Sequence, residues 1–172
     1  MLRIVKLDSP LNLTNKPIVT VGIADYKSAR NPHVLATYAL GSCVAVVLHD
    51  VMRSVGGLIH AMLPEPHDPA NVDNPYRYVE TGVRQAVKDL LRHVVSVKRL
   101  EAVIVGGANV LRNVSALNIG SRNVEKARNV LRELGVRLVG EDTGGTASRS
   151  VFYDITQGVV YVVSRRMRKL FG

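Results

Sequence analysis

The chain has 172 residues, of which 47% are hydrophobic and 22% are charged, and this composition is typical of one globular domain rather than a disordered or fibrous protein. Its one cysteine excludes an intramolecular disulfide and fits the reducing cytoplasm. No apolar run approaches the roughly 20 residues of a membrane helix, and charges and proline interrupt the N-terminus before a signal peptide could form. We therefore expect a soluble, cytoplasmic protein without membrane insertion.

The charge balance leaves two kinds of partner open. Lys and Arg number 23 against 14 Asp and Glu, a net charge of +9 that suits nucleic acid or an acidic protein surface. The basic residues are scattered, and the densest run is Arg165–Lys169. With two Phe and no Trp, few side chains are available to stack on bases. We favour an acidic protein partner over nucleic acid.

The first half of the chain predicts an edge segment, a hairpin and a helix. Residues 1–18 are expected to form an N-terminal extension or edge segment, and Ile18–Ile23 a short strand. Val44–Leu48 and Val55–Ala61 are strand-like runs on either side of a polar turn. Pro64–Tyr76 is rich in proline and predicts an irregular loop. Asn74-Pro75 then favours a helix start. Apolar residues recur beyond it at helical spacing, namely Val79, Val83, Val87, Leu90, Leu91 and Val94.

The second half predicts a strand, a helix and three more strands. Ala102–Val105 is a compact apolar strand that ends at Gly106-Gly107. Ser121–Leu134 has a helical apolar stripe and stops at Gly135. The remaining strands are Val136–Val139, Arg149–Asp154 and Val159–Ser164, followed by a basic C-terminal tail at 165–172. The pattern predicts a single domain over residues 1–172 of the α/β (α+β) class, with a largely antiparallel sheet and two main helices packed on it.

Cys43 lies in the stretch YALGSCVAVVLHD, directly after Leu-Gly-Ser and before five apolar residues. A nucleophilic cysteine needs an exposed sulfur, nearby amides and a base. A hairpin with its turn at Asp50–Arg53 would place Cys43 opposite His60, and opposed residues share a face with Cβ atoms about 4.5–5.5 Å apart. The pattern therefore predicts a nucleophile and a base at the open end of one hairpin.

The residues before Cys43 fit that interpretation. Gly41 would permit a sharp bend, and backbone amides around Ser42 and Cys43 would then be free to hold an oxyanion. The alternative is that Cys43 and His60 are ordinary buried strand residues, since free cysteine is among the most buried residue types. Both interpretations remain open at this point.

Metal and nucleotide sites find little support in the sequence. The five histidines show no close pair at ligand spacing, and one cysteine cannot build a thiolate site. The pairs Gly106-Gly107 and Gly144-Gly145 lack the lysine and the spacing of a phosphate loop. We expect neither a metal nor an organic cofactor. The histidines are His33, His49, His60, His67 and His93.

Five ordered blocks of the sequence resemble the chemoreceptor glutamine deamidase family, CheD. They are TYALGSCVAVVLHD, GGLIHAMLP, VGGANV, LNIGSRNVEKARNVL and GEDTGGTASRSV, and the similarity extends from about Val19 to Val163. The resemblance implies an enzyme, a protein-glutamine glutaminase, that converts glutamine side chains of chemoreceptors to glutamate through a cysteine thioester and can hydrolyse glutamyl methyl esters. It also implies a sandwich-like core related to bacterial toxin deamidases.

The same resemblance implies roles for individual residues and partners. The family's nucleophile corresponds to Cys43, its histidine to His60, and its third residue to Thr37, which would orient His60. Gly41 and Ser42 would bind the substrate and the oxyanion. The implied partners are the cytoplasmic helices of chemoreceptors and a CheC-type phosphatase of the response regulator. Two alternatives are a non-catalytic receptor- or phosphatase-binding module and a basic nucleic-acid-binding protein.

The remaining family positions have no assigned role at this stage. The two glycine pairs keep the family pattern, as do Asn118, Arg122 and Arg149. They could shape either the site or only the fold.

Overall fold

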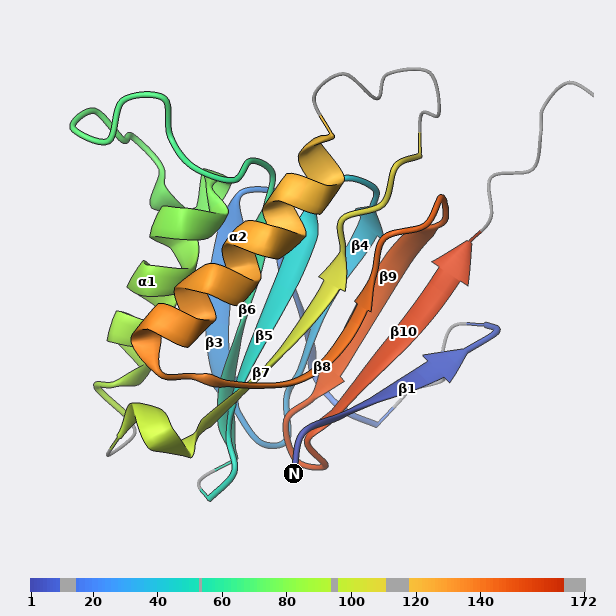
Figure 1. Ribbon diagram of the computed structural model, residues 1–172. Helices are drawn as coiled ribbons and strands as arrows, with labels where there is room; N and C mark the ends of the chain where they lie inside the picture. The colour runs from blue at the N-terminus through green and yellow to red at the C-terminus, as the bar shows by residue number, and fades with distance from the viewer. Residues whose placement is uncertain (10–14, 53, 94–95, 111–117, 166–172) are drawn as a thin grey trace, which may run out of the picture.

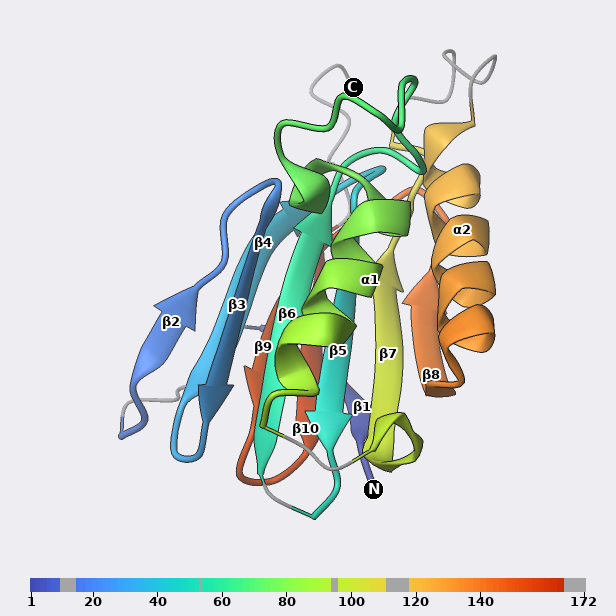
Figure 2. The same ribbon diagram turned by 90° about the vertical axis from the view of Figure 1, so that its left-hand side faces the viewer.

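The computed structural model describes residues 1–9, 15–52, 54–93, 96–110 and 118–165. These residues form two stacked five-stranded sheets, with two helices on the outer face of one of them (Figure 1). The order of layers is therefore helices, first sheet, second sheet, and Figure 2 shows the same order from the helical side. The expected α+β class, the sandwich-like core and the two main helices are confirmed.

The first sheet, which carries the helices, has the order β3-β6-β5-β7-β8. Its strands are β3 (Asp25–Arg30), β5 (Val44–Asp50), β6 (Val55–Ala61), β7 (Leu100–Gly106) and β8 (Arg137–Thr143).

The second sheet has the order β1-β10-β9-β4-β2. Its strands are β1 (Arg3–Leu7), β2 (Ile18–Thr20), β4 (Val34–Leu40), β9 (Ser148–Asp154) and β10 (Val159–Arg165).

Most of the strand pairs are antiparallel, as predicted, but both sheets also contain parallel pairs. The hairpins β5–β6 and β9–β10 are antiparallel as expected, whereas β1–β10, β2–β4 and β7–β8 are parallel. The N-terminal segment supplies the edge strand β1, while residues 10–14 lie outside the described part. Of the basic tail, Arg165 ends β10 and residues 166–172 also lie outside it.

Helix α1 (Val79–Leu90) begins later than Asn74-Pro75 predicts. The side chain of Asn74 does act as a cap, because it accepts a hydrogen bond from Tyr76 N, but the capped element is the 3₁₀ turn η1 (Pro75–Arg77). Within the predicted stripe, Leu91 lies beyond the helix and is 41% exposed, and Val94 lies outside the described residues. The first four stripe residues are buried as expected.

Helix α2 (Ile119–Leu134) ends at Gly135, which adopts the left-handed conformation with φ 76°, as the stop signal predicts. Neither described helix is long and apolar enough to span a bilayer. A second 3₁₀ turn, η2 (Val97–Arg99), precedes β7.

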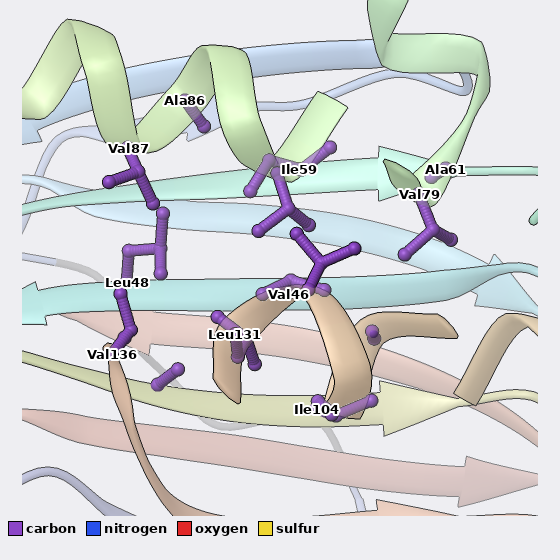
Figure 3. Packing of buried hydrophobic residues seen from close by; sticks show 14 of the residues in the cluster. Val46, Leu48, Ile59, Ala61, Val79, Ala86, Val87, Ile104, Leu131 and Val136 are labelled. Atoms are coloured by element: carbon purple, nitrogen blue, oxygen red, sulfur yellow. The ribbon is translucent and has the colours of Figure 1, made fainter. Parts of the chain in front are cut away.

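Strand β5 is buried along its whole length because it has hydrophobic layers on both faces. Val46 and Leu48 pack against the helices with Ile59 and Leu131 (Figure 3). On the opposite face, Ala45 and Val47 belong to the cluster that fills the space between the two sheets. This two-sided burial explains the continuous apolar run that follows Cys43.

Candidate functional site

The β5–β6 hairpin has a register two residues away from the predicted one. Ala45, not Cys43, pairs with His60, and the last pair at the open end is Val44 with Ala61. The shift arises because Asp50 stays in the strand and starts the turn itself, its Oδ1 accepting a hydrogen bond from Met52 N at 2.7 Å. The loop between the strands is therefore 51–54 rather than Asp50–Arg53.

A shift of two residues preserves the faces of the strands, so Cys43 and His60 still lie on the same side of the sheet. They are diagonal neighbours rather than directly opposed, and such neighbours are about 7–8 Å apart. That side faces the second sheet, because Cys43 packs against the cluster between the sheets. No hydrogen bond joins the Cys43 thiol to His60 in the described part of the chain. Proton transfer between them therefore needs rotation of the thiol.

Thr37, on β4 of the second sheet, contacts the imidazole of His60 across the space between the sheets. Its Oγ1 lies 2.7 Å from His60 Nδ1 and 2.8 Å from the carbonyl oxygen of Val21. A carbonyl can only accept, so the single hydroxyl proton is donated to Val21. The hydroxyl oxygen must then accept a hydrogen bond from Nδ1–H. The contacts thus fix the tautomer of His60, with the proton on Nδ1 and a lone pair on Nε2.

Nε2 of His60 is buried, and no described residue hydrogen-bonds to it. The side chain as a whole is 1% exposed, and burial lowers its pKa from 6.5 to about 4. The ring is therefore neutral at neutral pH. A neutral imidazole with a free Nε2 has the lone pair that a general base needs, but the lowered pKa makes it a weaker base than an exposed histidine.

The Cys43 thiol is half-buried at the rim of the sheet. Burial raises its pKa above the usual value, so the thiol rather than the thiolate is the resting form. Cys43 and His60 thus form a neutral pair, and the sulfur becomes a nucleophile only when its proton is removed.

The backbone around Cys43 is held by three consecutive carbonyl groups. The carbonyl oxygen of Gly41 accepts from Ala108 N at 2.8 Å, and that of Cys43 accepts from Gly107 N at 2.9 Å. Between them, the carbonyl oxygen of Ser42 accepts from Asn123 Nδ2 at 2.9 Å. In a trans peptide the N–H points away from the C=O of the same unit, so the amides of Ser42 and Cys43 point away from these donors. Within the described residues neither amide donates a backbone hydrogen bond.

The chain bends at Gly41 and Ser42, where it crosses from β4 in one sheet to β5 in the other. The expected bend is therefore present, but the left-handed residue is Ala39, with φ 55°, and not Gly41. Ala39 lies in an irregularity of the β4–β9 pairing between Thr37 and Leu40. This kink near the end of β4 and the bend that follows connect Thr37 on β4 to Cys43 just before β5.

Gly106 and Gly107 shape this site as well as the fold. A Cβ on Gly106, whose φ is +111°, would lie 2.4 Å from the carbonyl oxygen of Cys43. A Cβ on Gly107 would lie 2.3 Å from Val124 Cγ2 and 2.8 Å from the carbonyl oxygen of Gly120. Side chains at either position would push the Cys43 segment or α2 away, so only glycine fits.

The other family positions support neighbouring loops. Arg149 is buried, pairs with Asp142 and donates to the carbonyl oxygen of Gly144 at 2.8 Å, which holds the second glycine pair in place. Asn118 precedes α2 in the left-handed conformation. Arg122 makes an exposed ion pair with Glu65, far less constrained than Arg149.

A cavity of about 430 Å³ adjoins the bend before Cys43. Gly41 and Ser42 form one wall, and the start of α2 at Ile119 and Gly120 forms another. Its lining is mainly apolar with a few polar side chains, as is usual for a site that accepts part of a substrate.

Among the described residues, no group of three or more His, Cys, Asp or Glu side chains is placed to hold a metal ion. His49, for example, lies in a buried contact with Tyr153, its Nδ1 2.6 Å from the hydroxyl oxygen.

Asn123 is the site residue that the sequence interpretation missed. It is fully buried on α2, where it shares the stripe that contains Ala127 and Leu131. A polar residue on the buried side of a helix was the available signal, because buried polar groups require partners.

Comparison with known proteins identifies the family. A family model described as CheD chemotactic sensory transduction matches residues 62–164, which lie just after His60. The chain also shares 44% identity over 88% of its length with the probable chemoreceptor glutamine deamidase CheD of Thermococcus kodakarensis, 92% of which is covered.

The chain belongs to the CheD family. The chemoreceptor glutamine deamidase CheD of Thermotoga maritima is 42% identical over 83% of this chain and 88% of its own length, and the probable CheD of Pyrococcus abyssi is 43% identical over 90% and 93%. Among solved structures, Neisseria meningitidis protein NMB0706 covers 76% of this chain and 65% of its own, with a TM-score of 0.49 and 14% identity. That similarity is too low to support a functional comparison.

Proposed function

We propose that this CheD-family protein is a chemoreceptor glutamine deamidase that acts through Cys43, His60 and Thr37. The observation that carries the proposal is the Thr37–His60 contact, which leaves the lone pair of a buried, neutral imidazole on Nε2, on the same face as the thiol. An ordinary core histidine would have a partner for both ring nitrogens. The curated relatives named as deamidases supply the reaction class.

The first half of the reaction forms a thioester. His60 Nε2 accepts the thiol proton of Cys43 while the sulfur attacks the carboxamide carbon of the glutamine. The negative charge on the amide oxygen is stabilised by the outward-pointing amides of Ser42 and Cys43. His60 then donates its proton to the nitrogen, the C–N bond breaks, and ammonia leaves.

The second half hydrolyses the thioester. Water attacks the acyl carbon, His60 Nε2 accepts a proton from it, and the C–S bond breaks to leave glutamate and the restored thiol. The same sequence with a methyl ester releases methanol instead of ammonia. Thr37 touches no reacting atom; it keeps Nε2 unprotonated by holding Nδ1–H.

The substrates of this reaction would be glutamines on the cytoplasmic helices of chemoreceptors, which places the protein in the cytoplasm. We expect no metal or organic cofactor to take part. A CheC-type phosphatase would bind across the same opening and compete with the receptor. The cavity beside Gly41 and Ser42 would receive substrate atoms next to the reacting carboxamide.

The test is mass spectrometry of a purified receptor fragment after incubation with the parent protein or with Cys43→Ala. We expect glutamine to become glutamate with the parent protein and to stay unchanged with Cys43→Ala. Full conversion by the variant would assign the chemistry to another residue. A receptor that binds the parent protein without conversion would favour a non-catalytic binding module instead.

The phosphatase is tested by titrating it into the same assay. Inhibition that excess receptor relieves is the expected result. A ternary complex with undiminished conversion would contradict a shared surface.

A further inference from the structure

Asn123 links the backbone segments next to the proposed nucleophile and the proposed base. Its Nδ2 donates to the carbonyl oxygen of Ser42 at 2.9 Å and to that of Met62 at 3.0 Å. Ser42 directly precedes Cys43, and Met62 lies two residues after His60. One side-chain amide on α2 therefore contacts the segment before β5 and the segment after β6, at the open end of the hairpin.

The Asn123 contact lies just beyond the last residue pair of β5 and β6. The last β5–β6 pair is Val44 with Ala61, and continuation of that register would bring Cys43 opposite Met62. The two strands diverge here, because the Met62 amide turns to the carbonyl oxygen of Arg77 at 2.9 Å. The Asn123 side chain bridges the gap and sets the separation of the strands at the level of Cys43.

The oxygen of the same side chain points to a role beyond packing. Asn123 Oδ1 is buried and accepts no hydrogen bond from a described residue. A buried acceptor without a partner is unfavourable, and native structures keep few of them. Packing alone would favour an apolar side chain at this position. Instead, an amide occupies the position, and it contacts the segments next to Cys43 and His60.

We propose that Asn123 is a positioning residue that fixes the separation between the Cys43 sulfur and His60 Nε2. The inference rests on the proposed function, since it concerns the same two reacting groups. Without the bridge, the Ser42 and Met62 segments relax independently, and the sulfur no longer returns to one place relative to the imidazole. Errors of about 1 Å in such a geometry can lower a rate about a hundredfold.

The experiment is a double-mutant cycle on the reactivity of Cys43, which needs no receptor. Iodoacetamide alkylation is measured at neutral pH in the parent protein, Asn123→Ala, His60→Ala and the double variant. We expect His60→Ala to slow Cys43 alkylation about tenfold when it is introduced into the parent protein. In the Asn123→Ala background we expect it to slow alkylation about twofold or less, because a displaced imidazole already contributes little to activation of the thiol. On receptor, Asn123→Ala should lower kcat with KM unchanged.

Val130→Ala is the matched control, because Val130 is buried on the same helix but lies seven residues after Asn123, about 10 Å farther along the helix axis. It should leave the effect of His60→Ala unchanged. If Asn123→Ala fails to fold, Asn123→Thr replaces it, since its one hydroxyl proton can serve only one of the two carbonyls.

Equal slowing by His60→Ala in the presence and absence of Asn123 would overturn the proposal. This failure differs from failure of the proposed function. A parent protein that converts receptor glutamines but shows an additive cycle refutes only the role of Asn123. A coupled cycle without receptor conversion refutes only the deamidase assignment.

Discussion

The hydroxyl group of Thr37 has one proton, which it donates in a hydrogen bond to the carbonyl oxygen of Val21. This local constraint determines the chemistry of His60, because it leaves only the hydroxyl oxygen to face Nδ1. In the proposed mechanism, Thr37 would thus determine which nitrogen of the imidazole acts as the base. Burial between the sheets completes the effect by keeping the ring neutral.

The protonation state of His60 can be measured by ¹⁵N NMR of the imidazole. We expect a proton on Nδ1, none on Nε2, and a pKa of about 4 because burial disfavours the charged ring. A ring with its proton on Nε2, or one that titrates near its ordinary pKa, would contradict the proposed base.

The same shift predicts how the stability of the fold depends on pH. The unfolded chain binds the His60 proton at a pKa of 6.5 and the folded chain at about 4. As the pH falls through this window the unfolded state takes up the proton first, so the free energy of unfolding decreases by up to about 3 kcal/mol. Urea unfolding at several pH values should show this loss in the parent protein and a smaller one in His60→Gln.

Thr37→Val tests the hydroxyl at nearly constant side-chain size. The substitution leaves Nδ1–H without an acceptor and frees the ring to adopt the other tautomer. We expect kcat for deamidation to fall about tenfold to a hundredfold, which is less than the roughly 10²- to 10⁴-fold that general acid–base catalysis typically supplies, because His60 itself remains; KM should change little. Thr37→Ser keeps the hydroxyl and should retain most of the activity. Equal activity of the Val and Ser variants would show that the hydroxyl has no part in the reaction.

At the scale of elements, three segments meet around Cys43 at the open end of the β5–β6 hairpin. The bend after β4, the Gly106-Gly107 turn after β7 and the first turns of α2 enclose the backbone of Cys43, and their hydrogen bonds hold it. Helix α2 comes this close because a glycine, Gly120, faces the carbonyl oxygens of Gly107 and Ala108. The proposed nucleophile therefore lies on a backbone segment whose carbonyl groups are held by hydrogen bonds.

Gly106→Ala tests this enclosure, and Gly144→Ala is its control. Both glycines have positive φ, but the new Cβ would lie 2.4 Å from the Cys43 carbonyl oxygen at position 106 and would meet nothing within 4 Å at position 144. We expect Gly144→Ala to cost only the backbone strain of about 1–2 kcal/mol and to keep kcat. Gly106→Ala should lose more stability and most of its activity, as thermal unfolding and receptor assays would show. Similar activity in both variants would mean that the Cys43 backbone tolerates displacement.

Local patterns in the sequence predict the hairpin and both helices, because each depends on residues close together in the chain. The register was wrong because Asp50 starts the turn with its own side chain while still paired in β5. Spacing did not predict the Thr37–His60 contact, since these residues lie on different sheets and meet only when the sheets stack. The edge strand β1 and the parallel pairs likewise depend on partners distant in sequence.

At the scale of the whole molecule, the sandwich gives the proposed base and the proposed nucleophile different surroundings. His60 is buried between the sheets, whereas Cys43 lies at the rim and is only half-buried. Burial keeps the imidazole neutral, and in the proposed reaction the glutamine would enter at the rim. Some basic side chains form surface ion pairs, such as those of Arg84 with Glu80 and Glu133.

The net charge of +9 predicts how salt affects the reaction with an acidic receptor helix. Opposite charges speed the encounter, and salt screens them, so kcat/KM should fall as ionic strength rises while kcat stays constant. Steady-state kinetics at several salt concentrations measures this. Cys43 alkylation by the neutral iodoacetamide serves as the control and should not change. Tight duplex DNA binding at physiological salt, without receptor binding, would instead favour a nucleic-acid partner.

The most direct test of the account is detection of the covalent intermediate on Cys43. Acid quenching during turnover, followed by mass spectrometry of the protein, should find Cys43 acylated by the receptor-derived glutamyl group after loss of ammonia. His60→Ala should form this thioester much more slowly. Receptor conversion without any adduct on Cys43, or with the adduct on another residue, would contradict the mechanism.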